Sequence, residues 1–291
     1  KNHEFVRNAV ALHEVGLKAP EVRGVDYDLG LLAVTDLGDT QLIGCLDESN
    51  VLAWYGKAIA LLPRLGAVEL ELEPFDAAFM ARENAIFPEW LLGQHLQLTL
   101  SAEEEQLLAE TFACLTANNL AQPQGVMHRD FHSRNLMVCG GQTPGESELA
   151  IIDFQDMVIG PLSYDLVSLL KDCYVRWPDE VIEQGMRQGF ETLRQAELLG
   201  GLDYAAFRRA ADLTGMQRHL KAAGIFTRLW HRDGKSGYLK DIPRTLDYVV
   251  DVCRTHGESY PVLVHFGAWL EQVVLPGLTR VAEARADGAA S

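Results

Sequence analysis

The sequence predicts an α+β fold in two lobes, with a small β-containing N-terminal lobe and a large, mostly helical C-terminal lobe. Three observations lead to this prediction. Two short apolar runs near the start flank a turn, long stretches with helical periodicity follow them, and a few short apolar runs lie between polar turns in the middle of the chain. We expect residues 1–46 to form a partial N-terminal lobe and hinge, and residues 47–291 to form the C-terminal lobe.

The N-terminal segment combines one helix with one strand pair. Residues from Asn2 to about Glu14 have helical periodicity, and the runs 21–27 and 29–35 flank the turn-prone residues around Gly30. The apolar positions that we expect to face inward from this helix are Phe5, Val6, Ala9, Val10 and Leu12. Since Lys1 is not an initiator methionine and the helix begins at once, we expect the numbering to begin inside a domain.

The remainder of the chain is predicted to be helical, with three short strands at its centre. Ser101 followed by Glu104 has the spacing of a capping box, which indicates a helix start. The expected helices are 51–65, 79–95, 101–119 and several from Pro161 to about Ala284, and the expected strands are 124–128, 136–139 and 149–154.

Composition limits the possible partners. The 291 residues carry 25 Lys and Arg against 41 Asp and Glu, a net charge of −16, which works against binding to nucleic acid or to an anionic membrane. No apolar run approaches the roughly 20 residues of a membrane span. Five scattered cysteines without a CxxC pair argue against a disulfide framework and a zinc site, and favour a reducing cytoplasm. No obligate protein partner is expected.

The chemistry-bearing residues lie in one motif in the middle of the chain. His128, Asp130 and Asn135 form an HxDxxxxN pattern, and Asp153 follows an apolar pair eighteen residues after Asn135. Phosphoryl transfer needs a carboxylate near the attacking hydroxyl and hard oxygen ligands for magnesium. We therefore assign Asp130 as the catalytic base, and Asn135 and Asp153 as ligands of Mg²⁺, with ATP as co-substrate. The alternative is a loop whose polar residues only form caps and turns.

This motif resembles the aminoglycoside phosphotransferase and choline kinase branch of the kinase-like superfamily. The resemblance implies a protein-kinase-like fold in which His128 and Asp165 support the catalytic loop. The segment Val34-Thr35-Asp36-Leu37-Gly38 resembles the hinge of that fold. We therefore expect the backbone of Asp36, Leu37 and Gly38 to meet the adenine of ATP.

A narrower resemblance extends over most of the chain. The segments 87–90, 128–138, 165–174 and 216–221 are similar to bacterial cytosolic kinases that phosphorylate the anomeric hydroxyl of N-acetylmuramate and N-acetylglucosamine in cell-wall recycling. If this holds, the product is a sugar 1-phosphate. The chain departs from the kinase-like pattern because it shows neither a phosphate-covering loop nor a strand with an ATP-contacting cation. We expect those strands to precede Lys1.

Several further residues are candidates for substrate contact, each with a plainer alternative. His132 and Arg134 could meet phosphate or a sugar hydroxyl, or Arg134 could pack against an acidic neighbour. Asp172 lies seven residues after Asp165, so one continuous helix would turn both toward the catalytic loop. A sugar contact or a salt bridge would explain it equally well. The remaining candidates are Glu89 and Trp90, which could instead belong to the core, and Gln217 and Arg218.

Three other functions compete with a sugar kinase. An aminoglycoside or choline-type phosphotransferase would suit the acidic composition, because cationic acceptors would be attracted. A non-catalytic pseudokinase would need no complete set of Asp130, Asn135 and Asp153. A metal-dependent hydrolase is disfavoured because its usual ligand spacings are absent.

Overall fold

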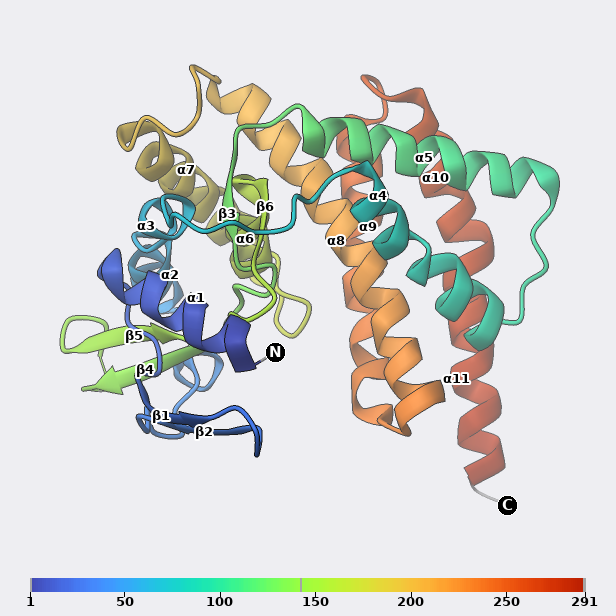
Figure 1. Cartoon of the computed structure of the whole chain (residues 1–291). Coiled ribbons are helices and arrows are strands. Elements are labelled where there is room, and N and C mark those ends of the chain that lie inside the picture. The colour runs from blue at the N-terminus through green and yellow to red at the C-terminus, as the bar shows by residue number, and fades with distance from the viewer. Residues whose placement is uncertain (1, 142, 290–291) are drawn as a thin grey trace. The chain divides into compact units, whose positions relative to one another are not determined.

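A computed structural model describes residues 2–141 and 143–289, which divide into two compact units (Figure 1). Unit 1 contains residues 1–75, 122–172 and 177–211, and unit 2 contains residues 76–121, 173–176 and 212–291. The predicted lobe boundary after residue 46 lies inside unit 1, and it stays a prediction. All of the strands belong to unit 1, whereas the described part of unit 2 is built from helices.

The strands of unit 1 form three antiparallel pairs. β1 (Val22–Asp26) pairs with β2 (Leu31–Val34), which confirms the predicted strand pair and its turn. β4 (Leu136–Gly140) and β5 (Ser147–Ile151) form a second hairpin, coloured yellow-green in Figure 1. β3 (Gln124–Met127) matches the predicted strand 124–128, so all three strands predicted in this region are present. The HxDxxxxN motif therefore occupies the loop between β3 and β4.

The partner of β3 is a strand that the sequence analysis missed. β6 (Val158–Pro161) pairs with β3 in antiparallel register, although only helices were expected soon after this point. A Cβ atom at Gly160 would lie 2.5 Å from the sulfur of Met127, so glycine at this position leaves room for the Met127 side chain. The pairing holds both ends of the catalytic segment, residues 128–157, together at one short sheet.

The helices of unit 1 differ from the predicted ones in two places. Val10 on α1 is 51% exposed, so its predicted inward position is wrong. The predicted helix 51–65 is interrupted after Ile59, because Pro63 has no amide hydrogen for a continuous helical ladder and instead lies in the first turn of a new helix. The helices are α1 (Asn2–Glu14), η1 (Leu42–Cys45), α2 (Val51–Ile59), α3 (Leu62–Gly66), α6 (Ser163–Leu170) and α7 (Asp179–Gln195).

Unit 2 is a helical unit around one apolar core. Ser101 caps α5 and forms the predicted capping box with Glu104. The predicted helix 79–95 is interrupted near Pro88, where α4 gives way to a π-helical segment. The elements are α4 (Ala77–Asn84), η2 (Phe87–His95), α5 (Ala102–Leu120), the greater part of α8 (Tyr204–Asp233), η3 (Ser236–Asp241), α9 (Ile242–His256), α10 (Pro261–Trp269), η4 (Leu270–Val274) and α11 (Leu275–Ala289).

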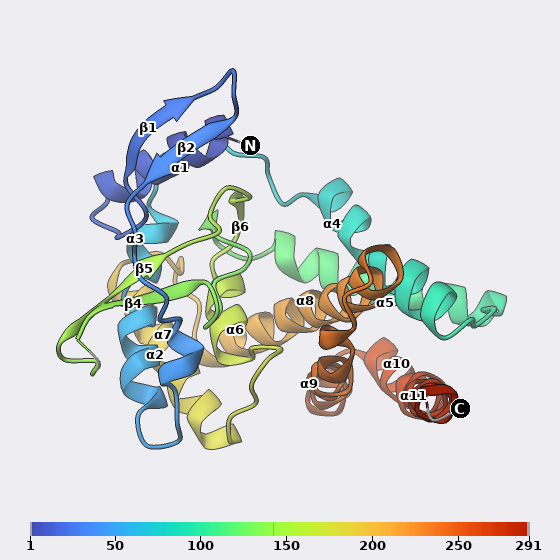
Figure 2. The same cartoon turned by 90° about the horizontal axis from the view of Figure 1, so that it is seen from below.

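The last helical run corrects one expectation from composition. Residues 261–285 form a continuous helical stretch of 25 residues that is long and apolar enough to cross a membrane, whereas no such run was predicted. Core helices satisfy the same criterion. Phe266, Leu270 and Val274 are fully buried in the core of unit 2. Figure 2 looks along α11 and shows α9 and α10 beside it.

One glycine sets the distance between α8 and η2 within unit 2. A Cβ atom at Gly224 would lie 2.6 Å from the carbonyl oxygen of Ile86 and 2.9 Å from the amide nitrogen of Phe87. Both are backbone atoms and cannot rotate away. Because η2 carries the candidates Glu89 and Trp90, this contact also fixes the position of two predicted substrate residues relative to α8.

We therefore predict that Gly224→Ala lowers the free energy of unfolding by about 1–3 kcal/mol, because the helices must separate. This loss should appear although alanine has the higher helix propensity, by about 1 kcal/mol. Gly237→Ala is the matched control, since no atom lies within 4 Å of its added Cβ. Urea unfolding followed by circular dichroism measures both variants. Equal stability of the two would contradict the proposed close contact.

Candidate active site

The catalytic loop is held by a buried carboxylate on α6. Asp165 is 3% exposed, and its two oxygens accept hydrogen bonds from the backbone amides of His128 at 2.6 Å and Arg129 at 3.0 Å. Two consecutive amides can point at one carboxylate only if the chain turns sharply. Accordingly, Arg129 has a left-handed backbone with φ of 76°. A non-glycine residue in this region is strained and persists only where surrounding contacts impose it.

Burial dominates the electrostatics of Asp165. Desolvation raises its pKa from 3.8 to about 6, although the nearby His128 and the two amide hydrogen bonds act in the opposite direction. The charged form is thus costly to bury, and the two amides offset part of this cost. The same amides make the charged form the better acceptor.

His128 joins the loop to the strand that leads to Asp153. Its Nε2 is 2.9 Å from the carbonyl oxygen of Ile152, which can only accept, so Nε2 carries the proton. Its Nδ1 is 3.3 Å from the amide nitrogen of Asp130, which can only donate. The ring is therefore an Nε2–H tautomer that bridges two segments. These are contacts of the kind that the predicted supporting role requires.

The three residues predicted to carry the chemistry lie close together. Asn135 Nδ2 donates to the backbone oxygen of Asp130 at 3.0 Å and lies 3.4 Å from Asp153 Oδ2. Gln155 Nε2 donates to the other carboxylate oxygen of Asp153 at 2.7 Å. Asp130 and Asn135 are half-buried, whereas Asp153 is exposed. The structure thus brings the Asn135 carboxamide beside the Asp153 carboxylate and the backbone of Asp130.

α1 supplies a buried anchor that the sequence analysis missed. Asn8 is 0% exposed, and its Nδ2 donates to the backbone oxygen of Phe154 at 2.9 Å, directly after Asp153. The rings of Phe5 and Phe154 pack with centroids 4.8 Å apart. Asp153 itself has a left-handed backbone with φ of 63°. A buried polar residue on an amphipathic helix was the available signal, because such a residue needs a partner.

The residues present fit a magnesium ion held together with phosphate. Asn135 makes its side-chain hydrogen bonds through Nδ2, so its Oδ1 can serve as a hard oxygen ligand together with the neighbouring Asp153 carboxylate. Within residues 2–141 and 143–289, no three His, Cys, Asp or Glu side chains are grouped to hold a metal. Mg²⁺ needs only one or two protein carboxylates when substrate phosphates and water complete its shell. A nucleotide-dependent Mg²⁺ site is therefore compatible with these residues.

Asp172 contacts the catalytic loop, but not from a continuous helix as predicted. α6 ends at Leu170, and Lys171 has φ of −113° and ψ of 52°, outside the helical region. Asp172 is fully buried and accepts hydrogen bonds from Ser133, which no sequence argument had singled out. On the loop itself, His132 is buried and Arg134 is half-buried. Their roles stay predictions.

The other substrate candidates belong to unit 2. Glu89 is exposed and Trp90 is half-buried on η2. Gln217 is fully buried and donates to Asn84 at 3.1 Å. Arg218 is buried and its Nη1 lies 3.5 Å from the sulfur of Cys173. A binding role for these four residues stays a prediction.

The predicted hinge runs beside β4. Gly38 donates its amide to the Asp36 carboxylate at 2.8 Å and has a left-handed φ of 79°. The carbonyl of Leu37 lies 3.7 Å from the sulfur of Cys139, and two residues after Gly38 the carbonyl of Thr40 accepts from the amide of Val138. The hinge segment is therefore attached to the strand that follows the catalytic loop.

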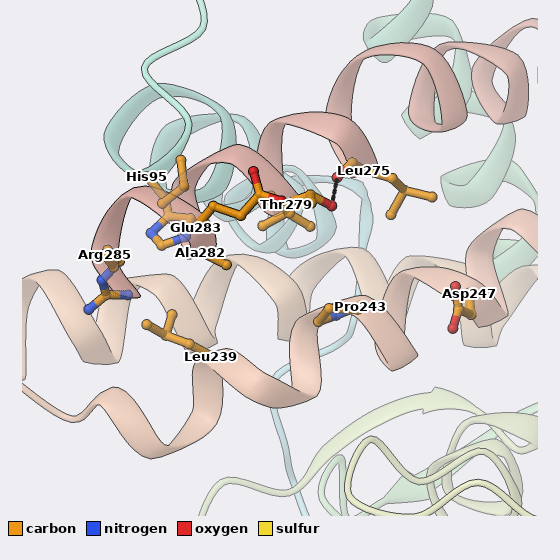
Figure 3. A pocket seen from close by; sticks show the side chains of 11 residues that line it. His95, Leu239, Pro243, Asp247, Leu275, Thr279, Ala282, Glu283 and Arg285 are labelled. Carbon is orange, nitrogen blue, oxygen red and sulfur yellow. Dashed lines mark hydrogen bonds between the residues drawn. The ribbon is translucent and has the colours of Figure 1, made fainter. Parts of the chain in front are cut away.

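Unit 2 contains a cavity of about 460 Å³ between α9 and α11, with His95 among its lining residues at one end (Figure 3). Its walls are largely apolar, and it includes charges of both signs in Asp247, Glu283 and Arg285. Burial and the positive charge of His231 and Arg285 lower the pKa of His95 to about 4. None of the predicted site residues lines this cavity, so it is separate from the catalytic constellation.

The fold is of the kinase-like class. Solved structures with this fold include an ethanolamine kinase from Plasmodium vivax and the choline kinase LicA from Streptococcus pneumoniae. The first has a TM-score of 0.61 and 10% identity over 84% of this chain and 72% of the other. The second has a TM-score of 0.56 and 15% identity over 85% and 81%. The predicted two-lobed α+β class is thereby confirmed.

Within this class, the chain belongs to the phosphotransferase enzyme family, whose profile matches residues 1–199. It is 40% identical to the N-acetylmuramate/N-acetylglucosamine kinase of Neisseria meningitidis over 84% of this chain and 74% of that protein. The enzyme of the same name from Pseudomonas putida is 35% identical over 85% and 72%. The chain is therefore an enzyme that transfers phosphoryl groups, and the predicted resemblance is confirmed.

We predict that Asp165→Asn lowers turnover about tenfold or more, since an asparagine NH₂ would face one of the two loop amides and leave a buried donor unsatisfied. Initial rates on the folded enzyme measure this. Asp28→Asn, at an exposed turn position of unit 1, is the matched control.

The same substitution has a predicted pH signature. The pKa of Asp165 is raised on folding, so the folded state binds more protons than the unfolded state between about pH 4 and 6. Wild-type stability relative to Asp165→Asn should therefore fall as pH rises through this window and level off above it. A constant difference in unfolding free energy from pH 4 to 7 would contradict the assignment.

Proposed function

We propose that this protein transfers the γ-phosphoryl group of ATP to the anomeric hydroxyl of an N-acetylated amino sugar, N-acetylglucosamine or N-acetylmuramate, in the cytoplasm. The observation that carries the proposal is the 40% identity to the N. meningitidis kinase over 84% of this chain. It is supported by a second relative with the same name at 35% identity. The HxDxxxxN motif and Asp153 supply the groups that the reaction needs.

In the proposed reaction Asp130 orients the acceptor hydroxyl and accepts its proton as the bond to phosphorus forms. The adjacent backbone supports this role, because the Asp130 carbonyl is bonded to Asn135 and its amide to His128. The proton leaves the sugar oxygen for the carboxylate, while ADP departs with the electrons of the broken P–O bond. His132 and Arg134 remain candidates for contacts to phosphate or sugar.

Asn135 and Asp153 would hold Mg²⁺, which neutralises the phosphate charge when it is bound. Each carboxylate oxygen of Asp153 accepts one hydrogen bond, from Asn135 or Gln155, and retains a second lone pair for a metal. Asn135 uses Nδ2 for its bond to the loop, and Gln155 and Asn8 fix the segment around Asp153 from the protein side. The backbone of Asp36, Leu37 and Gly38 is proposed to meet the adenine.

The acceptor is tested by measuring ADP release from the purified full-length protein. We expect turnover with N-acetylglucosamine and N-acetylmuramate, and none with the 1-deoxy analogue of N-acetylglucosamine, which lacks only the anomeric hydroxyl. Choline and an aminoglycoside are compared because the net charge of −16 would attract cationic acceptors. If choline or the aminoglycoside is turned over preferentially, the acceptor is that cation and not the amino sugar. Turnover of the 1-deoxy analogue would move the reaction to another hydroxyl.

The role of Asp130 is tested by Asp130→Asn. Loss of a general base should lower kcat by about 10²–10⁴-fold. Nucleotide affinity, measured by calorimetry with ADP and Mg²⁺, should stay near that of the wild type, because Asp130 is not assigned to the metal. Unchanged turnover would remove this role from Asp130.

A further inference from the structure

Ser133 is fixed within the catalytic loop through all of its polar groups. It lies between Asp130 and Asn135 and is 0% exposed. Its Oγ donates to Asp172 Oδ2 at 2.5 Å, and its backbone amide lies 3.3 Å from the same oxygen. Its carbonyl accepts from the amide of Ile43 at 3.0 Å. All three polar groups of Ser133 are therefore bonded to residues outside the loop.

These bonds connect two parts of the proposed active site. Ile43 belongs to η1, which begins four residues after the hinge candidate Gly38. Asp172 lies two residues after the end of α6 at Leu170, and α6 also carries Asp165. Asp165 holds the start of the loop and Asp172 holds its middle. One buried helix thus anchors the loop at two points.

The functional groups of the loop depend on this second anchor. The Asp130 carbonyl accepts from the His132 amide at 2.9 Å and from Asn135 Nδ2 at 3.0 Å, and the His132 carbonyl accepts from the Asn135 amide at 2.9 Å. Ser133 is part of this short turn. If Ser133 moves, the carboxylate and the carboxamide on either side of it must move as well. Displacements of about 1 Å can cost about 10²-fold in rate.

We propose that Asp172 is a positioning residue that acts through Ser133 to fix Asp130 and Asn135 in their reactive arrangement. The inference rests on the proposed function, and it replaces the earlier candidate role of Asp172 as a sugar contact. Asp172 Oδ2 is already bonded to Ser133, and the side chain is fully buried and therefore out of reach of a sugar in solution. A charged acceptor also makes this serine bond stronger than a neutral one would be.

The test compares Ser133→Ala, Asp172→Asn and the double variant. Loss of the serine bond to a charged acceptor should lower kcat about tenfold or more, with the acceptor KM within about twofold of the wild type. Asp172→Asn keeps the volume and one acceptor oxygen, so it should fold and lose less activity. Once the Ser133 hydroxyl is removed, Asp172→Asn should cost little more. Ser168→Ala is the matched control, because this buried α6 serine has no hydrogen-bond partner among the described residues.

Three outcomes would overturn the proposal. Wild-type kcat in both single variants would remove the positioning role. A raised acceptor KM in Asp172→Asn, together with wild-type kinetics in Ser133→Ala, would indicate that Asp172 contacts the sugar. If the double variant shows the sum of the two single-variant losses in activation free energy, Asp172 does not act through Ser133. Rates are taken at a temperature at which circular dichroism shows each variant folded, so a stability loss alone leaves kcat unchanged.

The readouts also separate this inference from the proposed function. If the wild type phosphorylates no amino sugar, the proposed function fails. The variants are then compared by ATP hydrolysis in the absence of an acceptor, which depends on the same loop geometry. Equal hydrolysis by Ser133→Ala, Asp172→Asn and Ser168→Ala would overturn the positioning role independently of the acceptor.

Discussion

The buried carboxylate of Asp165 is the contact on which the rest of the site depends. By accepting two consecutive amides it forces the loop into a turn that Arg129 would not adopt unaided. That turn places the His128 ring between the Ile152 carbonyl and the Asp130 amide. Because one carboxylate orients the segment before Asp130 and, through His128, the strand before Asp153, the two acidic groups cannot shift independently.

This arrangement requires a rigid support, and α6 provides it. All eight residues of α6 are buried, so the helix cannot tilt without disturbing the core of unit 1. A helix that is buried on every side is normally apolar throughout, yet this one carries Asp165, and Asp172 lies two residues after its end. Hydrogen bonds from the loop compensate part of the cost of desolvating these carboxylates. Polar residues on a fully buried helix therefore identify the surface against which the active site is built.

The sequence alone predicted those features whose motif lies within a short stretch of the chain. The spacing of His128, Asp130 and Asn135 lies within one loop, and the capping box of α5 lies within one turn, so both were predictable. Contacts between distant segments were not. Asn8 reaches Phe154 across 146 residues, and Asp172 reaches Ser133 across 39. No periodicity or short motif encodes such pairs, which is also why β6 was missed until its pairing with β3 was seen.

The composition of the proposed metal site would explain how it stays selective. Asp153 and Asn135 would supply one charged and one neutral oxygen ligand, and the described residues hold no group of three or more His, Cys, Asp or Glu that could bind a metal. Two such ligands bind Mg²⁺ weakly alone, because this ion needs six oxygens and releases water reluctantly. In the proposed reaction the phosphates must supply the missing oxygens. Metal and nucleotide then occupy the site together, and a strongly acidic protein avoids collecting free divalent cations at its catalytic loop.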